Sequence, residues 1–352
     1  MEVSAQSLKQ EWQNLLAQEP KIRIRNAAEK LGVSEVELLA TQCGENVIRL
    51  EPKFSAILAK IESLGKVMAL TRNNDVVHER KGVYLNSSLD NPHVGLFVGE
   101  DIDLRIFFST WKSVFAVSEG EGKTLRKSIQ FFAKDGEAIH KIFLTNESNE
   151  TAYDVLVQEF TSVNQNPEEE VVFLKNEEVF AKVDEVDVKA FQQEWLDLKD
   201  THHFFGLLKK HRLSRTLALQ LAPKGNYAVP LNNTALEQIL NEVSQNNAEI
   251  MVFVGNKGMI QIHTGKAKKI VPMEQWLNVL DPDFNLHVAQ PTIAQSWIVR
   301  KPTEDGIVTS LECFDVKGEQ IVQLFGKRKP GIPELKLWQD IVEKVEQNSK
   351  LK

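Results

Sequence analysis

Cysteine is scarce in this sequence, which has only Cys43 and Cys313 among its 352 residues. Neither cysteine lies in a CxxC or CxxH pattern, so the spacing gives no sign of a disulfide framework, a zinc cluster or covalent cofactor attachment. Any cofactor is therefore expected to be held without a covalent bond to the chain.

Long apolar runs are also lacking. No stretch approaches the roughly 18 consecutive apolar residues that a transmembrane helix needs. The chain begins MEVSAQSLKQEW, which is polar and acidic where a secretory signal would be apolar. These absences predict a protein that remains in the cytoplasm and does not insert into a membrane.

Positive charge is in deficit, since the formal net charge is −7. With 42% hydrophobic and 26% charged residues, the composition is that of an ordinary globular protein. The acidic balance makes nucleic acid an unlikely partner. An anionic ligand would have to be met by a local basic cluster.

A helix-turn-helix pattern covers residues 25–40, where Gly32 ends one predicted helix and Ser34 caps the next. The second helix contains Glu35 and Glu37 and no lysine or arginine. Because contacts to phosphate require positive charge, the pattern is interpreted as structural.

The chain contains an internal duplication. Residues 66–82 align without a gap to residues 249–265 at an offset of 183, and residues 128–143 align to residues 310–325 at an offset of 182. A nearly constant offset of half the chain length indicates two related halves. We expect the repeats to comprise residues 1–165 and 166–352, with the acidic stretch 164–170 between them.

Each half begins with helical patterns and continues as short strands separated by turns. The turn signals are NND at 73–75, KDG at 134–136, GNKG at 255–258 and KG at 317–318. Strands joined by tight turns pair antiparallel. The expected fold class is α+β, with each half a meandering antiparallel sheet covered by helices and a last helix within residues 333–352.

The segment FQQEWLDLKDTHHFFGLLKKHRLSR, residues 191–215, predicts a helix that begins near Asp200. By helical spacing His202, Phe205, Gly206 and Lys209 share one face. Gly206 would leave room for a flat ligand bonded to the imidazole of His202, a common ligand of haem iron. A half-buried structural histidine fits the same spacing.

The pattern Asp-x-His-x-Phe-Phe-x-Leu-Leu-Lys at residues 200–209, with later stretches, closely resembles the HemS/ChuS family of bacterial cytoplasmic haem-utilisation proteins. The resemblance extends over nearly the whole chain. It implies that haem b is bound without a covalent link, with His202 as the iron ligand.

The resemblance also implies that Arg105, within DIDLRIF, reaches the other side of the haem, commonly through water. An arginine there would donate hydrogen bonds and stabilise negative charge that develops on oxygen. From the strand pattern alone, Arg105 equally fits a surface position. Candidate apolar walls of the haem site are Phe107, Phe204 and Phe205, next to Gly206.

The haem propionates require cations, and the family motifs place them at Arg215, Lys301 and Arg328. Taken singly, these residues would be interpreted as solvated surface charges. Where the family often has tyrosine in Gln-Leu-Tyr-Gly, this chain has Phe325. His78 matches a histidine considered as a second haem ligand, but its strand context favours an exposed hairpin histidine.

The two halves carry different candidates. Ile22 aligns with His202, and His287 aligns with Arg105. One ligand that uses His202 from one half and Arg105 from the other explains this asymmetry better than two equal sites.

The sequence leaves two main hypotheses. The first is an enzyme that accepts imported haem and opens the macrocycle with dioxygen and external electrons, so that haem is also the substrate. The second is a haem chaperone or store that passes haem to a separate oxygenase. A haem importer and a downstream oxygenase are the possible partners, and a haem-responsive DNA-binding regulator is disfavoured by the acidic second helix.

Overall fold

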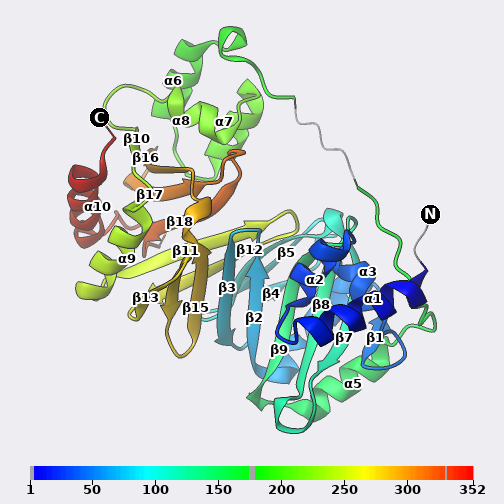
Figure 1. The fold of residues 1–352 in the computed structure, drawn as a ribbon. Coiled ribbons are helices and arrows are strands. Elements are labelled where there is room, and N and C mark those ends of the chain that lie inside the picture. Colours follow the sequence, from blue (N-terminus) through cyan, green and yellow to red (C-terminus); the bar gives the residue numbers. More distant parts are fainter. Residues whose placement is uncertain (1–3, 174–178, 330, 352) are drawn as a thin grey trace. The chain divides into compact units, whose positions relative to one another are not determined.

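The computed structural model describes residues 4–173, 179–329 and 331–351 (Figure 1). The α-helices of this part of the chain are α1 (Ala5–Gln18), α2 (Ile24–Leu31), α3 (Glu35–Ala40), α4 (Phe54–Lys60), α5 (Glu150–Phe160), α6 (Val188–Leu196), α7 (His203–His211), α8 (Arg215–Gln220), α9 (Ala235–Gln245) and α10 (Lys336–Ser349). None of these helices combines the length and the apolar character that crossing a membrane requires.

The strands of the first half are β1 (Val47–Leu50), β2 (Gly65–Arg72), β3 (Val76–Gly82), β4 (Ser87–Ser88), β5 (Val94–Val98), β6 (Asp103–Phe107), β7 (Trp111–Glu119), β8 (Arg126–Ala133) and β9 (Ala138–Ser148). Those of the second half are β10 (Ala228–Leu231), β11 (Glu249–Asn256), β12 (Met259–Lys266), β13 (Ile270–Met273), β14 (Trp276–Leu280), β15 (Phe284–Ala289), β16 (Gln295–Thr303), β17 (Gly306–Phe314) and β18 (Gln320–Gly326). Short 3-10 helices are η1 (Ile61–Leu64), η2 (Phe108–Thr110), η3 (Gly122–Thr124), η4 (Val183–Glu185) and η5 (Gln290–Thr292).

The chain divides into two compact units that each draw on more than one segment. Unit 1 consists of Met1–Arg72, Glu79–Lys175 and Gly255–Gln261, and unit 2 of Asn73–His78, Asn176–Val254 and Ile262–Lys352. Compact units are defined by contacts, whereas the predicted repeats were defined by alignment. The predicted repeat boundary at residue 165 therefore stays a prediction.

The order of elements from α1 to α5 recurs from α6 to α10. Unit 1 contains neighbouring strands in the order β1-β7-β8-β9-β2, and unit 2 contains the corresponding order β10-β16-β17-β18-β11. The pairings β7–β8 and β16–β17 are antiparallel, as are those of the hairpins β8–β9 and β17–β18. The predicted α+β fold with an internal duplication is confirmed.

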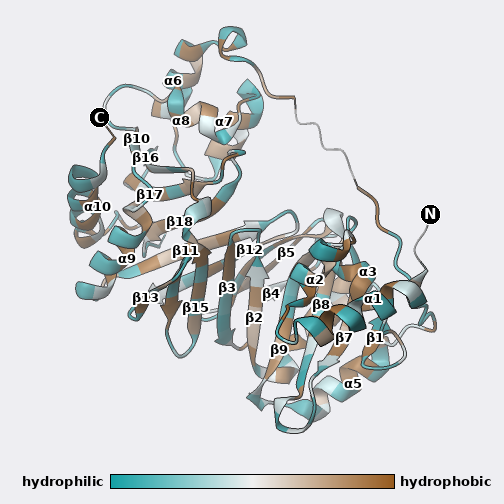
Figure 2. Ribbon diagram, viewed as in Figure 1, coloured by the Kyte–Doolittle hydropathy of each residue, from teal (hydrophilic) through white to brown (hydrophobic). Residues whose placement is uncertain are grey.

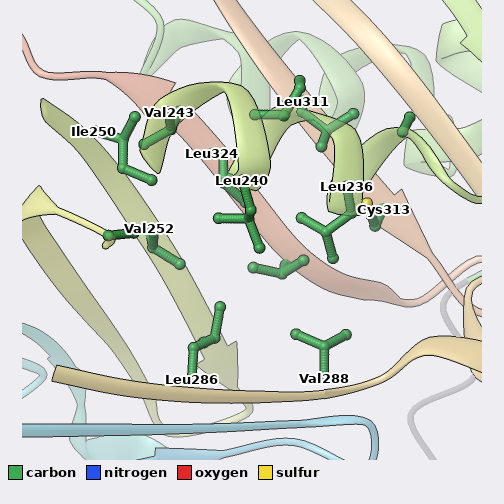
Figure 3. Packing of buried hydrophobic residues seen from close by; sticks show 14 of the residues in the cluster. Leu236, Leu240, Val243, Ile250, Val252, Leu286, Val288, Leu311, Cys313 and Leu324 are labelled. Carbon is green, nitrogen blue, oxygen red and sulfur yellow. The ribbon is translucent and has the colours of Figure 1, made fainter. Parts of the chain in front are cut away.

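Unit 2 buries both faces of its sheet at β16 and β17. On one face α9 and α10 cover an apolar core in which Leu236 and Leu240 pack toward Val252, Leu311 and Leu324 (Figure 3). On the other face α6, α7 and α8 pack on Trp297, Val299 and Phe314. Alternate residues of a strand point to opposite faces, so each strand supplies both cores.

Unit 1 uses the same plan. Helices α4 and α5 cover one face of β2, β7, β8 and β9, and α3 packs on the other face at Phe115 and Phe132. In Figure 2 the strands of both units are largely brown, and the outer sides of α1, α9 and α10 are teal. This is the amphipathic pattern expected of helices that lie on a sheet.

The predicted helix ends and turns are confirmed. Gly32 ends α2 with a positive φ of 69°, and Ser34 begins α3 with a capping box to Glu37. The Asn73 side chain accepts hydrogen bonds from the N–H groups of Asp75 and Val76 in the β2–β3 turn. The last helix begins three residues later than the predicted range, at Lys336, and residue 352 lies outside the described residues.

The acidic stretch 164–170 is packed on unit 1, and its place between the two repeats stays a prediction. Arg49 on β1 forms an ion pair with Glu169 and donates hydrogen bonds to the carbonyls of Asn166 and Glu168, both at 2.9 Å. The guanidinium also lies over the ring of Phe115 at 4.8 Å. The buried side chain of Arg49 therefore holds this stretch against the sheet through an ion pair and hydrogen bonds.

Candidate functional site

The side chain of Asp200 organises the start of α7. Its Oδ1 accepts a hydrogen bond from the backbone N–H of His202 at 2.8 Å and another from Nδ1 of the same residue at 2.6 Å. The backbone hydrogen bond from His202 is the main reason that the pKa of Asp200 lies below its usual value. A proton held on Nδ1 leaves Nε2 of His202 as the nitrogen available to a metal ion.

The predicted face of α7 is exposed. The His202 side chain is 90% exposed and Phe205 is 71% exposed. A Cβ atom added at Gly206 would meet nothing within 4 Å. His203 and Gly206 both border a groove of about 260 Å³, which is lined by α6, the residues that follow it and α7. The helical phase predicted for His202, Phe205 and Gly206 is therefore consistent with the structure.

Phe204 points inward, so of the two neighbouring phenylalanines Phe205 is the exposed one. Phe204 is 1% exposed and packs edge-on against Trp195 of α6, with ring centroids 4.6 Å apart. Its ring lies 4.7 Å from Nζ of Lys301 and 5.4 Å from Cζ of Arg215. The ring of Phe204 therefore covers the two cationic groups. Its contact with haem stays a prediction.

Those two cations converge on Glu312 of β17, which is fully buried. Arg215 binds the carboxylate through Nε at 2.6 Å and Nη2 at 2.8 Å, and Nζ of Lys301 approaches to 2.8 Å. Ser310 and Gln323 donate further hydrogen bonds to the same carboxylate, at 3.0 and 2.8 Å. The view of Arg215 and Lys301 as solvated surface charges was wrong, because burial is paired here with full hydrogen bonding.

Electrostatics keeps Glu312 and Lys301 charged near pH 7. Burial would raise the pKa of Glu312, but Arg215 and Lys301 outweigh it and the pKa lies well below the usual value. Burial lowers the pKa of Lys301 to about 8, against the opposing effect of Glu312. Two cations and one anion leave the Glu312 cluster, defined as Arg215, Lys301 and Glu312, with a surplus of one positive charge.

A half-buried aromatic surface lies beside this cluster on the same sheet face. Phe325 of β18 pairs in register with Met251 of β11, and its ring centroid is 5.2 Å from that of Phe253. Phe325 replaces the family tyrosine and so presents a ring without a hydroxyl. Sequence reasoning missed Met251, Phe253 and Glu312.

Arg328 follows β18 and is mostly buried. Its Nη2 lies 3.7 Å from the carboxylate of Asp305, and among the described residues its buried Nε has no hydrogen-bond partner. A buried donor without an acceptor suits an anionic ligand. Its predicted contact with a propionate stays a prediction.

Arg105 belongs to unit 1 and lies on β6. Its Nη1 forms an ion pair with Asp103 and donates to the carbonyl of Leu104 at 3.1 Å. The side chain is 35% exposed. Leu104 and Ile106 point into the core, so Arg105 and Phe107 share the opposite, half-buried face of the strand. Their predicted roles toward haem are not tested by these contacts.

The expectation that His78 is exposed was wrong. It is 0% exposed in β3 and packs edge-on against Phe284, with ring centroids 5.2 Å apart. His140 in unit 1 is also buried and shares hydrogen bonds with Thr71 at 2.8 Å and Tyr84 at 2.6 Å. Burial lowers the pKa of His140 to about 3, so its ring is neutral near pH 7.

The residues of unit 2 fit a flat, anionic ligand that carries a metal ion. An exposed imidazole with a fixed tautomer can bind the metal, and the glycine beside it leaves the approach open. The Glu312 cluster and Arg328 provide positive charge, and Phe325 with Phe253 provides apolar surface. The fold and these residues define a duplicated α+β protein with a candidate porphyrin-binding site.

Comparison with known proteins identifies the family. The family model described as the haemin-degrading HemS.ChuX domain matches residues 32–160 and 212–345. The chain therefore belongs to this family. It is 39% identical over 335 residues to the hemin transport protein HmuS of Yersinia pestis, covering 95% of this chain and 96% of that protein.

Solved structures agree with the family assignment. Holo-PhuS, a heme-binding protein from Pseudomonas aeruginosa, matches with a TM-score of 0.94 and 44% identity over 97% of this chain and 98% of that one. ChuS, described as an Escherichia coli heme oxygenase, matches with a TM-score of 0.86 and 37% identity over 96% of this chain and 99% of that one.

Proposed function

We propose that this protein binds one haem non-covalently in the cell and degrades it oxidatively to release iron. The observation that carries the proposal is the exposed imidazole of His202, whose Nδ1 is held by Asp200 at the start of α7. Relatives named as a hemin transport protein, a heme-binding protein and a heme oxygenase support it. In this proposal the protein is cytoplasmic and receives haem from an importer.

In the proposed reaction each of these residues has a separate role. Haem supplies the iron at which dioxygen reacts and the macrocycle that is opened. Asp200 keeps the proton on Nδ1 of His202, so that Nε2 remains a ligand. Phe205 and Phe325 cover apolar surface and exclude water. Arg105 donates hydrogen bonds that order water and stabilise developing negative charge.

A second candidate function is transfer of intact haem to a separate oxygenase. The high exposure of His202 and Phe205 favours it, since an open ligand face permits rapid exchange. The residues that would bind haem are the same in both cases. The two functions therefore differ in the fate of the macrocycle.

Incubation of the haem complex with dioxygen and a reductant, with catalase present, distinguishes the two. Degradation predicts loss of the Soret band and release of chelatable iron. Transfer predicts a stable Soret band until an apo-acceptor such as apomyoglobin is added. Failure of the protein to bind haem at all would overturn both functions.

Arg105→Ala tests the distal role. We expect it to retain haem but to slow Soret loss at least about tenfold, as removal of one transition-state hydrogen-bond donor does in other enzymes. Arg126→Ala, an exposed arginine at the start of β8, is the matched control and should leave the rate unchanged. Equal rates in the two variants would make Arg105 a surface residue.

A further inference from the structure

Asp103 and Arg105 lie two residues apart on β6, so their side chains project from the same face of the strand. The neighbouring strand β5 places Val98 opposite Asp103 and Leu96 opposite Arg105. The two charged side chains therefore have apolar neighbours across the ladder. A hydrogen bond between charged groups is stronger in such surroundings than in water.

The ion pair uses only part of the Arg105 guanidinium. Nη1 donates to the carboxylate of Asp103 and, at 3.1 Å, to the carbonyl of Leu104. Nε and Nη2 have no acceptor among the residues that the structure describes. The Asp103 side chain is 16% exposed and that of Arg105 is 35% exposed, so the carboxylate is the more deeply placed partner. Two nitrogens of the guanidinium thus remain for a ligand.

Each member of the pair depends on the other. Burial raises the pKa of Asp103, and the charge and hydrogen bond of Arg105 oppose this effect. In return, the carboxylate restricts the rotamers of a long side chain that would otherwise lose this freedom only when a ligand binds. The guanidinium is therefore held in one orientation before the ligand arrives.

The corresponding hairpin of unit 2 lacks the ion pair. At the offset of 182 that relates the two halves, His287 of β15 occupies the position of Arg105 and Asn285 that of Asp103. His287 shares a hydrogen bond with Asn278 of β14 at 2.7 Å. The hairpin thus forms without two opposite charges on one strand, so the fold alone does not explain Asp103.

We propose that Asp103 is a positioning residue for Arg105, whose Nη1 it holds so that Nε and Nη2 are presented to a ligand of the haem iron. The inference deepens the proposed function and rests on the distal role proposed there for Arg105. Because Asp103 does not itself contact the ligand in this arrangement, loss of its carboxylate should act only through Arg105.

Fluoride binding to the ferric haem complex tests this inference without turnover, because fluoride accepts hydrogen bonds from a distal donor. Its affinity is measured by spectrophotometric titration at one pH for the full-length protein, Arg105→Ala, Asp103→Asn and the double variant. We expect each single variant to bind fluoride about tenfold or more weakly, the range of a hydrogen bond to a charged group. Haem affinity should change less than about threefold.

An effect of charge alone predicts the opposite sign for Asp103→Asn. Without the carboxylate, the positive charge of Arg105 would be uncompensated and would attract fluoride more strongly. Fluoride binding that is unchanged or tighter in Asp103→Asn would therefore overturn the inference. The asparagine at the matching position 285 of the other half indicates that the hairpin tolerates this substitution.

The double variant shows whether Asp103 acts through Arg105. Once the guanidinium is absent there is nothing to position, so the double variant should bind fluoride within about threefold of Arg105→Ala. A further loss of about tenfold in the double variant would show that Asp103 acts independently and would overturn the inference.

Asp101→Asn is the matched control, because Asp101 lies two residues before Asp103 and forms its ion pair with Arg80. It removes the same charge and should leave fluoride affinity unchanged. Equal losses in Asp101→Asn and Asp103→Asn would overturn the inference. Failure to bind haem would contradict the proposed function itself, whereas weak fluoride binding by Arg105→Ala with normal binding by Asp103→Asn would contradict only the positioning role.

Discussion

At the start of α7 one carboxylate oxygen serves two groups. Oδ1 of Asp200 accepts hydrogen bonds from the backbone and from the imidazole of His202, at 2.8 and 2.6 Å. The first bond satisfies an N–H that the helix leaves unpaired, and the second fixes the tautomer of the imidazole. The spacing Asp-x-His therefore couples the formation of the helix to the presentation of Nε2.

Replacing Asp200 by asparagine should separate these two roles. Asparagine caps helices as well as aspartate does, so thermal stability should hardly change. The loss of negative charge behind the imidazole should weaken haem binding by about tenfold and raise the reduction potential of the iron. Spectroelectrochemical titration with measurement of haem affinity checks both effects.

Asp187→Asn is the control for that prediction. Asp187 caps α6 through a hydrogen bond from the N–H of Ala190 at 3.1 Å, and α6 does not contain the proposed haem ligand. Its replacement should alter neither affinity nor potential. A potential for Asp200→Asn equal to that of Asp187→Asn would show that the carboxylate acts only as a cap.

His140 makes the stability of unit 1 depend on pH. Its pKa falls from 6.5 in the unfolded chain to about 3 in the folded protein, because burial disfavours the charged ring. Between these values the unfolded state binds the proton and the folded state does not, so stability decreases as the pH falls from 6.5 toward 3. From pH 7 to pH 4 the loss should be on the order of 3 kcal/mol.

Urea unfolding of the protein and of His140→Gln at pH 7 and pH 4 measures this effect. Glutamine retains hydrogen-bonding groups near Thr71 and Tyr84 but does not titrate. From pH 7 to pH 4, the free energy of unfolding of His140→Gln should therefore fall by about 3 kcal/mol less than that of the unmodified protein. Parallel changes in the two proteins would show that His140 does not contribute.

At this scale the sequence indicated which residues share a helix face better than which polar residues are buried. The common face of His202 and Phe205 followed from helical spacing, which depends on neighbouring residues. The burial of His78 and Glu312 depends on which elements cover each strand, and strand alternation does not reveal this. A glutamate in the apolar stretch SLECF was the available signal for a buried, paired carboxylate.

The exposed face of α7 is the element on which the proposed binding of a flat ligand depends. Gly206 lies inside this helix, where glycine is unfavourable by about 1 kcal/mol relative to alanine. No neighbouring atom within 4 Å requires the missing side chain. An unfavourable residue that the packing does not require suggests that the open surface itself is needed.

Gly206→Ala and Gly206→Leu should therefore both be at least as stable as the unmodified protein. The leucine variant should bind haem at least about tenfold more weakly, because its side chain occupies the approach to His202. Lys189→Leu adds the same side chain at an exposed position of α6 and should bind haem normally. Normal binding by Gly206→Leu would place the haem on another face.

Element boundaries were predictable where the local chemistry determines them. Capping residues and turn glycines marked α3 and the hairpins β8–β9 and β17–β18. The segment around Asp200 became three helices, α6 to α8, because residues 197–202 and 212–214 interrupt the helical pattern. The packing of the acidic stretch on Arg49 depends on residues more than a hundred positions away, beyond the reach of local patterns.

For the whole molecule, the duplication gives two halves with the same order of elements. The repeated order of elements was predictable because the aligned segments coincide with β2–β3, β11–β12, β8–β9 and β17–β18. The division into units that exchange short segments was not, since it depends on contacts between distant parts of the chain.

Because the net charge of the protein is −7, the protein as a whole repels an anionic ligand. Binding of such a ligand must therefore rely on local positive charge. The Glu312 cluster provides it in unit 2. Since the proposed iron ligand is His202 and the matching position 22 holds isoleucine, we expect one haem per chain.

A spectrophotometric haem titration of the full-length protein, His202→Ala and His203→Ala tests the central claim most directly. The account predicts one haem per chain, weaker binding with a shifted Soret band for His202→Ala, and a nearly unchanged spectrum for His203→Ala. The two histidines are separated by about 100° around the helix, so they cannot bind one iron together. Two equally tight haems, or a spectrum that changes for His203→Ala and not for His202→Ala, would contradict it.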